Sequence, residues 1–116
     1  MNPLDKSKKI QNIYFYVSLG MFLLSTILFL AGYVLTQNVI AAPSALIDFA
    51  VIYFNYHYIH FIAGFGLLIY YHMEKKKHQF EMKVVKTLLG IFTTPFSYII
   101  LLIGILLLGL SSCAGS

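Results

Sequence analysis

Three long stretches that contain no lysine, aspartate or glutamate dominate this chain and leave it few possible folds. They are residues 13–35, 49–73 and 87–110 of a chain of 116 residues. An α-helix rises about 1.5 Å per residue, so each stretch is long enough to cross the ~30 Å hydrocarbon core of a bilayer. The sequence therefore predicts an all-α integral membrane protein with three transmembrane helices, forming a single domain over residues 1–116.

Composition and charge agree with a membrane protein. Charged residues make up 10% of the chain, whereas soluble domains carry about 25%. The net charge of +4 comes from lysines that flank the apolar stretches, so we expect the lipid bilayer as a partner and no nucleic acid. The single cysteine, Cys113, excludes an internal disulfide and a cysteine-based metal site. The first stretch is longer than the apolar core of a signal peptide, which favours a retained helix.

The positions of the lysines predict how the chain is oriented. All eight lysines lie within residues 1–12 or 74–86. If the chain crosses the membrane three times, these two segments lie on one side, and the connector 36–48 and the C-terminal segment lie on the other. Lysine-rich segments remain on the inner side of a membrane. We therefore expect the N-terminus on the cytoplasmic or matrix side and the C-terminus outside.

Small residues recur at seven-residue intervals in all three stretches. This spacing keeps one face of a helix turned toward one neighbour, and small side chains let membrane helices approach closely. We expect these residues to form the helix contacts, and His57, which falls on the same face in the second stretch, to face protein. The residues are Ser18, Ser25 and Gly32; Ala50, His57 and Gly64; and Gly90, Ser97, Gly104 and Ser111.

A proline predicts a kink in the third stretch, and tyrosines predict where the stretches meet the membrane surface. Pro95 interrupts the third stretch and predicts a kink, at which hydroxyls of Thr93, Thr94 or Ser97 bond to the freed carbonyl groups. Tyrosines near the ends of the stretches are expected at the membrane–water interface. These are Tyr14, Tyr16, Tyr33, Tyr70 and Tyr71.

Two histidines near the middle of the second stretch are the side chains with chemistry at that depth. His57 and His60 are three residues apart and share one side of a helix. An imidazole there must be neutral and hydrogen-bonded, or bind a ligand. Three interpretations are open: an axial ligand to a haem, a polar contact that aligns the helix with a partner subunit, or proton transfer at a quinone site. The stretches contain no carboxylate or lysine, which argues against an independent transporter.

The second stretch also reads His60-Phe-Ile-Ala-Gly64, with Gly66 close behind. With this motif and three predicted spans, the chain resembles the small membrane-anchor subunits of succinate dehydrogenase and fumarate reductase, in which a haem-ligating histidine precedes a glycine by four residues. The resemblance implies haem b with His60 as its metal ligand, Gly64 making room for the macrocycle, and His57 as a supporting contact. The free N–H of His60 is then expected to meet Ser97 or a carbonyl freed by Pro95.

The resemblance also implies a quinone and a set of partners. Tyr71 and His72 stand where the family has an aspartate and a tyrosine that serve a quinone site, so they are the residues expected to meet ubiquinone or menaquinone. The implied partners are a second membrane-anchor subunit, a flavoprotein and an iron–sulfur subunit. The implied location is the mitochondrial inner membrane or the bacterial cytoplasmic membrane. The chain would then be a non-catalytic part of a succinate:quinone oxidoreductase. The alternative is a cofactor-free structural accessory subunit of a large membrane complex.

Overall fold

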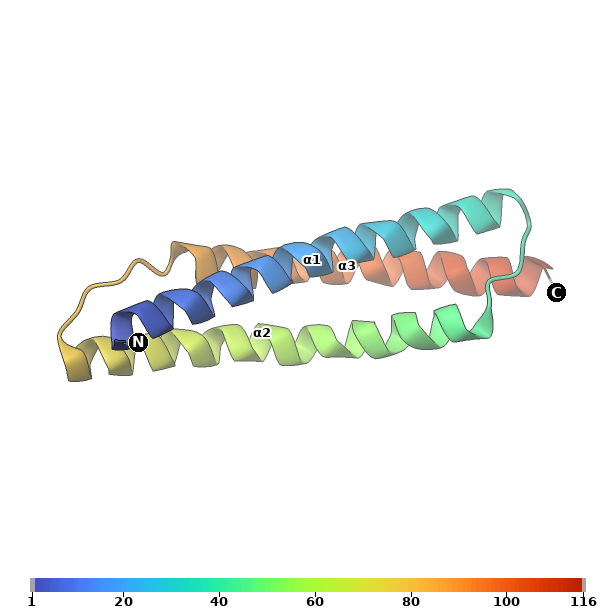
Figure 1. Ribbon diagram of the computed structural model, residues 1–116. Coiled ribbons are helices and arrows are strands. Elements are labelled where there is room, and N and C mark those ends of the chain that lie inside the picture. Colours follow the sequence, from blue (N-terminus) through green and yellow to red (C-terminus); the bar gives the residue numbers. More distant parts are fainter. Residues whose placement is uncertain (1, 116) are drawn as a thin grey trace.

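The computed structural model describes residues 2–115 and confirms the all-α fold. Three helices follow one another along the chain: α1 (Pro3–Gln37), α2 (Ser44–His78) and α3 (Val85–Gly115). They lie side by side in an elongated bundle with dimensions of 61 × 21 × 17 Å (Figure 1). The N-terminus and the α2–α3 connection lie at one end of the bundle, and the α1–α2 connection and the C-terminal end of α3 lie at the other. All segments that carry lysine therefore gather at one end.

The helices extend beyond the apolar stretches into the polar segments that flank them. α1 begins at Pro3 rather than near residue 13, since the Asn2 side chain accepts a hydrogen bond of 2.8 Å from the Asp5 amide and proline suits the first helical position. α2 continues to His78 through three lysines, whose positive charge is favourable in the last turn of a helix. Gln79, in the left-handed conformation, ends it.

Two of the helices are long and apolar enough to cross a membrane. They are α1 and residues Val85–Cys113 of α3, which contain 18-residue windows with mean hydropathies of 2.1 and 2.3. Among residues 2–115, α2 does not meet the same criterion, because its middle carries Asn55, His57, His60 and several tyrosines. The large apolar side chains on the outer faces of α1 and α3 are exposed, as expected for helices that contact lipid.

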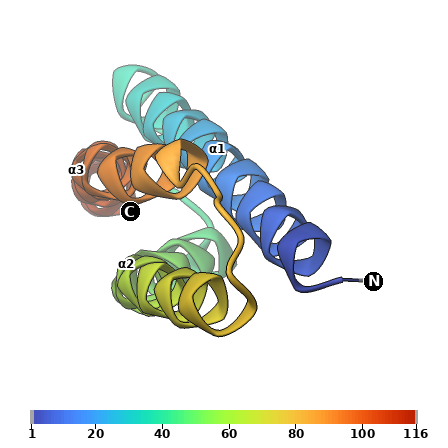
Figure 2. The same ribbon diagram turned by 90° about the vertical axis from the view of Figure 1, so that its left-hand side faces the viewer.

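α1 and α3 form the closest helix pair, and glycines make their approach possible. A Cβ atom at Gly32 would lie 2.9 Å from the Gly104 carbonyl oxygen, and one at Gly104 would lie 3.0 Å from the Phe29 Cα. No larger residue fits against backbone at these distances. The predicted seven-residue pattern is confirmed, because all ten residues of the three sets are buried. Viewed along the bundle, α1 is inclined to α2 and α3 (Figure 2).

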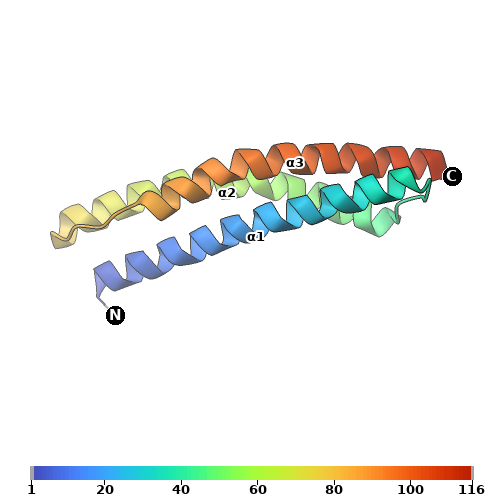
Figure 3. The same ribbon diagram turned by 90° about the horizontal axis from the view of Figure 1, so that it is seen from above.

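α3 remains one continuous helix through Pro95 and bends near its middle (Figure 3). The hydroxyl groups of Thr93 and Thr94 donate to the carbonyl oxygens of Leu89 and Gly90, at 2.6 and 2.9 Å. Pro95 lacks the N–H that would pair with the Ile91 carbonyl oxygen, so these hydroxyls bond to carbonyl groups one and two residues before the freed one, and not to the freed carbonyl as expected. Ser97 does not take this role, because its hydroxyl faces the other two helices.

Candidate functional site

His57 connects α2 to α3 in the middle of the bundle. Its side chain is 2% exposed, which confirms that it faces protein. Its Nδ1 lies 3.0 Å from the Tyr53 carbonyl oxygen, and its Nε2 lies 2.7 Å from the Ser97 Oγ. A carbonyl oxygen only accepts, so the Tyr53 contact assigns a proton to Nδ1. The Ser97 hydroxyl that contacts Nε2 also lies within hydrogen-bond distance, 3.2 Å, of the Met21 carbonyl oxygen. Both nitrogens of the His57 imidazole therefore have a partner within the chain.

Ser97 is the centre of a polar cluster to which all three helices contribute. The Ser25 Oγ of α1 lies 2.7 Å from the Ser97 Oγ of α3. The Tyr53 hydroxyl of α2 donates to the Met21 carbonyl oxygen of α1 and also contacts Ser25. A buried network whose members all have partners makes the packing rigid and specific. The cluster therefore holds the three helices in one relative position.

His60 makes the corresponding contact with α1. It is 3% exposed, and its Nε2 lies 2.7 Å from the Ser18 Oγ, while Ser18 donates to the Tyr14 carbonyl oxygen at 2.9 Å. Its Nδ1 lies 3.3 Å from the Tyr56 hydroxyl, one turn away on α2. Because Ser18 has a single proton to donate, these contacts assign the His60 proton to Nε2 and make Nδ1 the acceptor from Tyr56. Both nitrogens are again satisfied.

Tyr14 is the residue of this site that sequence reasoning missed. Its ring stacks on the His60 imidazole, with ring centroids 4.2 Å apart and an interplanar angle of 3°, and its hydroxyl donates to the His60 carbonyl oxygen at 2.9 Å. Tyr14 and Tyr71 are buried between helices, unlike the exposed Tyr16 and Tyr33, and the position of these tyrosines at the membrane interface stays a prediction. Tyr14 precedes Ser18 by four residues and shares its helix face. That spacing is the signal that could have identified it.

The arrangement around His60 does not fit the expected haem. Ser18 and Tyr56 contact the two imidazole nitrogens, so neither nitrogen is available to iron. A Cβ atom at Gly64 would collide with the Tyr14 hydroxyl and Ile91, so the space intended for the macrocycle is filled. Iron and macrocycle could enter only if Tyr14 and Ser18 moved away.

The hydrogen-bond partner of His60 is Ser18 and not Ser97 as expected. Ser97 bonds to His57 instead, at 2.7 Å, so the pairing of Ser97 with His60 is wrong. Three residues along a helix correspond to a rotation of about 300°, which leaves an angle of about 60° between the two side chains. That angle is enough for His57 to reach α3 while His60 reaches α1.

Tyr71 and His72 lie together at the end of the bundle that carries the lysines. They line one pocket of about 310 Å³, together with Lys75. The Tyr71 hydroxyl lies 3.3 Å from the Thr87 Oγ1, whereas His72 is exposed. The structure thus brings the two residues expected at a quinone site to one pocket, with the tyrosine held by α3 and the histidine open.

A second, apolar pocket of about 260 Å³ lies between α2 and α3 beside Pro95. His57 and Thr94 form part of its wall, and Tyr58 and Tyr98 close it with hydroxyl groups that lie 2.6 Å apart. The pocket offers few hydrogen-bonding groups, since the His57 nitrogens already have partners. It therefore suits an apolar group such as a lipid chain or a side chain of another protein.

Comparison of the chain with protein-family models, with curated proteins and with solved structures finds no match. The geometry of the site is therefore the basis for its interpretation. Within residues 2–115, no group of three or more His, Cys, Asp or Glu side chains is arranged to hold a metal ion. The two imidazoles connect helices, and their nitrogens are engaged by the chain itself.

Proposed function

We propose that the protein is a three-span membrane subunit that serves as a structural component of a membrane complex, with its histidines joining its own helices. The observation that carries the proposal is that both nitrogens of His57 and both nitrogens of His60 have partners within the chain. This favours the cofactor-free interpretation over a haem-binding anchor of the succinate dehydrogenase type, which requires Tyr14 and Ser18 to adopt other positions.

The outer face of α2 supports a third span. The isoleucines Ile52, Ile59, Ile62 and Ile69 are each more than 60% exposed, while both histidines point inward. A helix that turns apolar side chains outward and pairs its polar groups inside is suited to lipid. The lysines gather at one end of the bundle (Figure 1), which favours the orientation with the N-terminus inside.

An exposed amide on α2 supports a role as a subunit. Asn55 donates from Nδ2 to the Val51 carbonyl oxygen at 3.1 Å, and its Oδ1 has no partner in the described part of the chain. Gly66, three turns further along the same face, has open space at its Cβ position. An amide oxygen is costly in lipid and drives association between membrane helices, and small residues allow the approach. We propose that a helix of a partner subunit packs here.

The topology can be tested by cysteine labelling. Ser44→Cys, at the end of the bundle that lacks lysine, should react with a membrane-impermeant maleimide from the outside only, in a background carrying Cys113→Ser. Gln79→Cys, at the lysine-bearing end, is the matched control and should react from the inside only. Labelling of both positions from the same side would contradict a third span at α2.

The cofactor question is decided by visible spectra of the protein purified with its membrane partners. We expect no b-type band in the reduced-minus-oxidised spectrum. A b-type band that disappears in His60→Ala and persists in His57→Ala would instead establish the haem-binding anchor. The same preparation shows whether the co-purifying partners include a flavoprotein and an iron–sulfur protein.

A further inference from the structure

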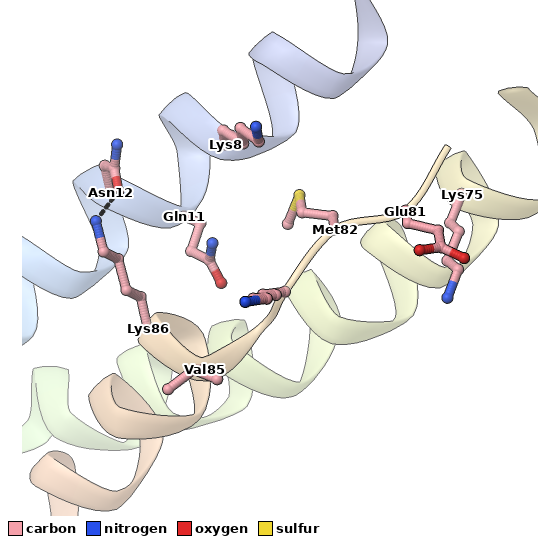
Figure 4. A pocket seen from close by; sticks show the side chains of 9 residues that line it. Lys8, Gln11, Asn12, Lys75, Glu81, Met82, Val85 and Lys86 are labelled. Carbon is pink, nitrogen blue, oxygen red and sulfur yellow. Dashed lines mark hydrogen bonds between the residues drawn. The ribbon is translucent and has the colours of Figure 1, made fainter. Parts of the chain in front are cut away.

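The lysine-bearing end of the bundle contains a pocket of about 870 Å³ (Figure 4). The first turns of α1, the last turns of α2 and the α2–α3 connection surround it. Five charged residues line it: the four lysines Lys8, Lys75, Lys83 and Lys86, and one glutamate, Glu81. The volume lies within the range of about 300–1,000 Å³ that is typical of ligand pockets.

The positive charge of this pocket is not neutralised by the chain. The ion pair formed between described side chains joins His78 and Glu74, and within residues 2–115 no lysine forms one. Lys86 donates from Nζ to the Asn12 Oδ1 at 3.0 Å, the bond drawn in Figure 4. That neutral partner orients the ammonium group and leaves its charge uncompensated, so the pocket attracts anions.

The floor of the pocket includes a side-chain amide whose NH₂ group can donate to a ligand. Gln11 is 6% exposed, and its Oε1 accepts from the Thr87 amide and hydroxyl at 3.3 and 3.1 Å. These bonds fix the orientation of the side chain, and its NH₂ group has no acceptor among residues 2–115. Gln11 lines the pocket. An NH₂ group at the wall of a pocket, with no acceptor in the described part of the chain, can donate to an anionic oxygen bound there.

The other walls of the pocket are apolar and adjoin the membrane-facing surface. Met82 and Val85 contribute to the lining, and the apolar parts of α1 and α3 begin within a turn or two of it. A soluble phosphate compound would not use an apolar wall that leads toward lipid. A ligand with an anionic group at one end and acyl chains at the other would use both.

We propose that this pocket binds the headgroup of an anionic phospholipid. The phosphate lies among Lys8, Lys83 and the Gln11 amide, and the glycerol and acyl chains run past Val85 onto the apolar surface of α1 and α3. Basic pockets between membrane helices on the inner side are suited to such headgroups, and long lysine side chains reach the phosphate level while their stems contact apolar surface. The inference rests on the proposed three-span topology, because α1 and α3 run parallel and their lysine-bearing ends lie on one side only if α2 crosses back. It is independent of haem, and cysteine labelling at Ser44 and Gln79 tests the topology separately from lipid binding.

The test is lipid binding to the full chain in detergent, measured by native mass spectrometry. The probes are phosphatidylglycerol, phosphatidylcholine and inorganic phosphate. We expect phosphatidylglycerol to bind and to raise the thermal stability, phosphatidylcholine to bind at least about tenfold more weakly, and inorganic phosphate to compete only at far higher concentration. Equal binding of the two lipids, or equal competition by inorganic phosphate, would overturn the proposal.

Paired variants separate the pocket from general surface charge. Lys8→Gln with Lys83→Gln should lower the affinity for phosphatidylglycerol about 30-fold. Lys9→Gln with Lys77→Gln removes the same charge from the same end of the bundle outside the pocket, and should lower it by less than about threefold. Equal losses in the two pairs would reduce the effect to surface potential and contradict a site.

A substitution at Gln11 tests the floor of the pocket. Gln11→Glu keeps an oxygen for Thr87 and replaces the NH₂ group by a carboxylate oxygen that repels a phosphate. We expect at least a tenfold loss of affinity for phosphatidylglycerol and, without lipid, little change in melting temperature. Unchanged affinity in a folded Gln11→Glu protein would exclude the proposed phosphate position. The two lysine pairs decide the proposal if Gln11→Glu does not fold.

Discussion

The contact between α1 and α3 and the attachment of α2 use different physical means. α1 and α3 approach until backbone meets backbone, with Gly32 opposite Gly104. α2 stands off and is connected by side chains, since His57 reaches Ser97 and His60 reaches Ser18. The bundle thus combines a pair of closely packed helices with a third helix held by hydrogen bonds.

Under the proposed three-span topology, the difference indicates what replaces the hydrophobic effect when these helices associate in lipid. Lipid chains are as apolar as leucine, so association depends on close packing and on polar contacts. α1 and α3 combine both, because they pack backbone to backbone and also share hydrogen bonds such as Ser25 to Ser97. α2 has no such backbone approach at Gly64, where it meets side chains, and depends more on polar contacts. We therefore expect steric changes to dominate at the α1–α3 contact and hydrogen-bond deletions to dominate at α2.

The largest effect is expected from Gly104→Leu. The Cβ atom of the new leucine would lie 3.0 Å from the Phe29 Cα. A backbone atom cannot move aside by a change of rotamer, as a side-chain atom can. Overpacking costs about 1–3 kcal/mol. We expect Gly104→Leu to lower the free energy of unfolding by about 3 kcal/mol or more, measured by titration with a denaturing detergent. Gly109→Leu is the control, since its Cβ position has open space. Equal destabilisation by both would refute close packing as the basis of the α1–α3 contact.

A smaller loss of unfolding free energy is expected from Ser97→Ala. This change removes the hydrogen-bond partner of His57 and leaves its buried Nε2 unpaired. The cost of such a group is about 1–3 kcal/mol. Thr93→Ala is the control, because its hydroxyl bonds only within α3. A double-mutant cycle with His57→Ala should give a coupling energy of about 0.6–1.7 kcal/mol in the unfolding free energy. A coupling energy of zero would mean that the polar cluster does not attach α2.

The smallest effects are expected from removing single tyrosine hydroxyls. Tyr14→Phe loses the bond to the His60 carbonyl oxygen at 2.9 Å in a buried site, and should cost about 1 kcal/mol of unfolding free energy. Tyr58→Phe loses the bond to Tyr98 on the exposed side, and should cost about 0.5 kcal/mol or less. The reverse order would show that the outer pair, rather than the Tyr14 contact, holds α2.

Much of the fold was predictable because helix faces follow from spacing. Length and apolar character identified the helices, and the seven-residue interval identified Ser97, Gly104 and His57 as buried. The identity of each partner was not predictable, because it depends on how α1 is inclined to the other helices. Sequence spacing therefore placed His57 and His60 on one side of α2 without showing that one meets α3 and the other α1.

The Ser97 cluster has a consequence for the order in which the chain enters a membrane. α2 is synthesised before α3, yet the hydroxyl that satisfies the His57 Nε2 comes from α3. Until α3 arrives, α2 is a helix of marginal hydropathy with an unmet polar group, and such a segment inserts poorly by itself. Under the proposed topology we therefore expect α2 to enter the bilayer together with α3, so that the last helix made completes the insertion of the one before it.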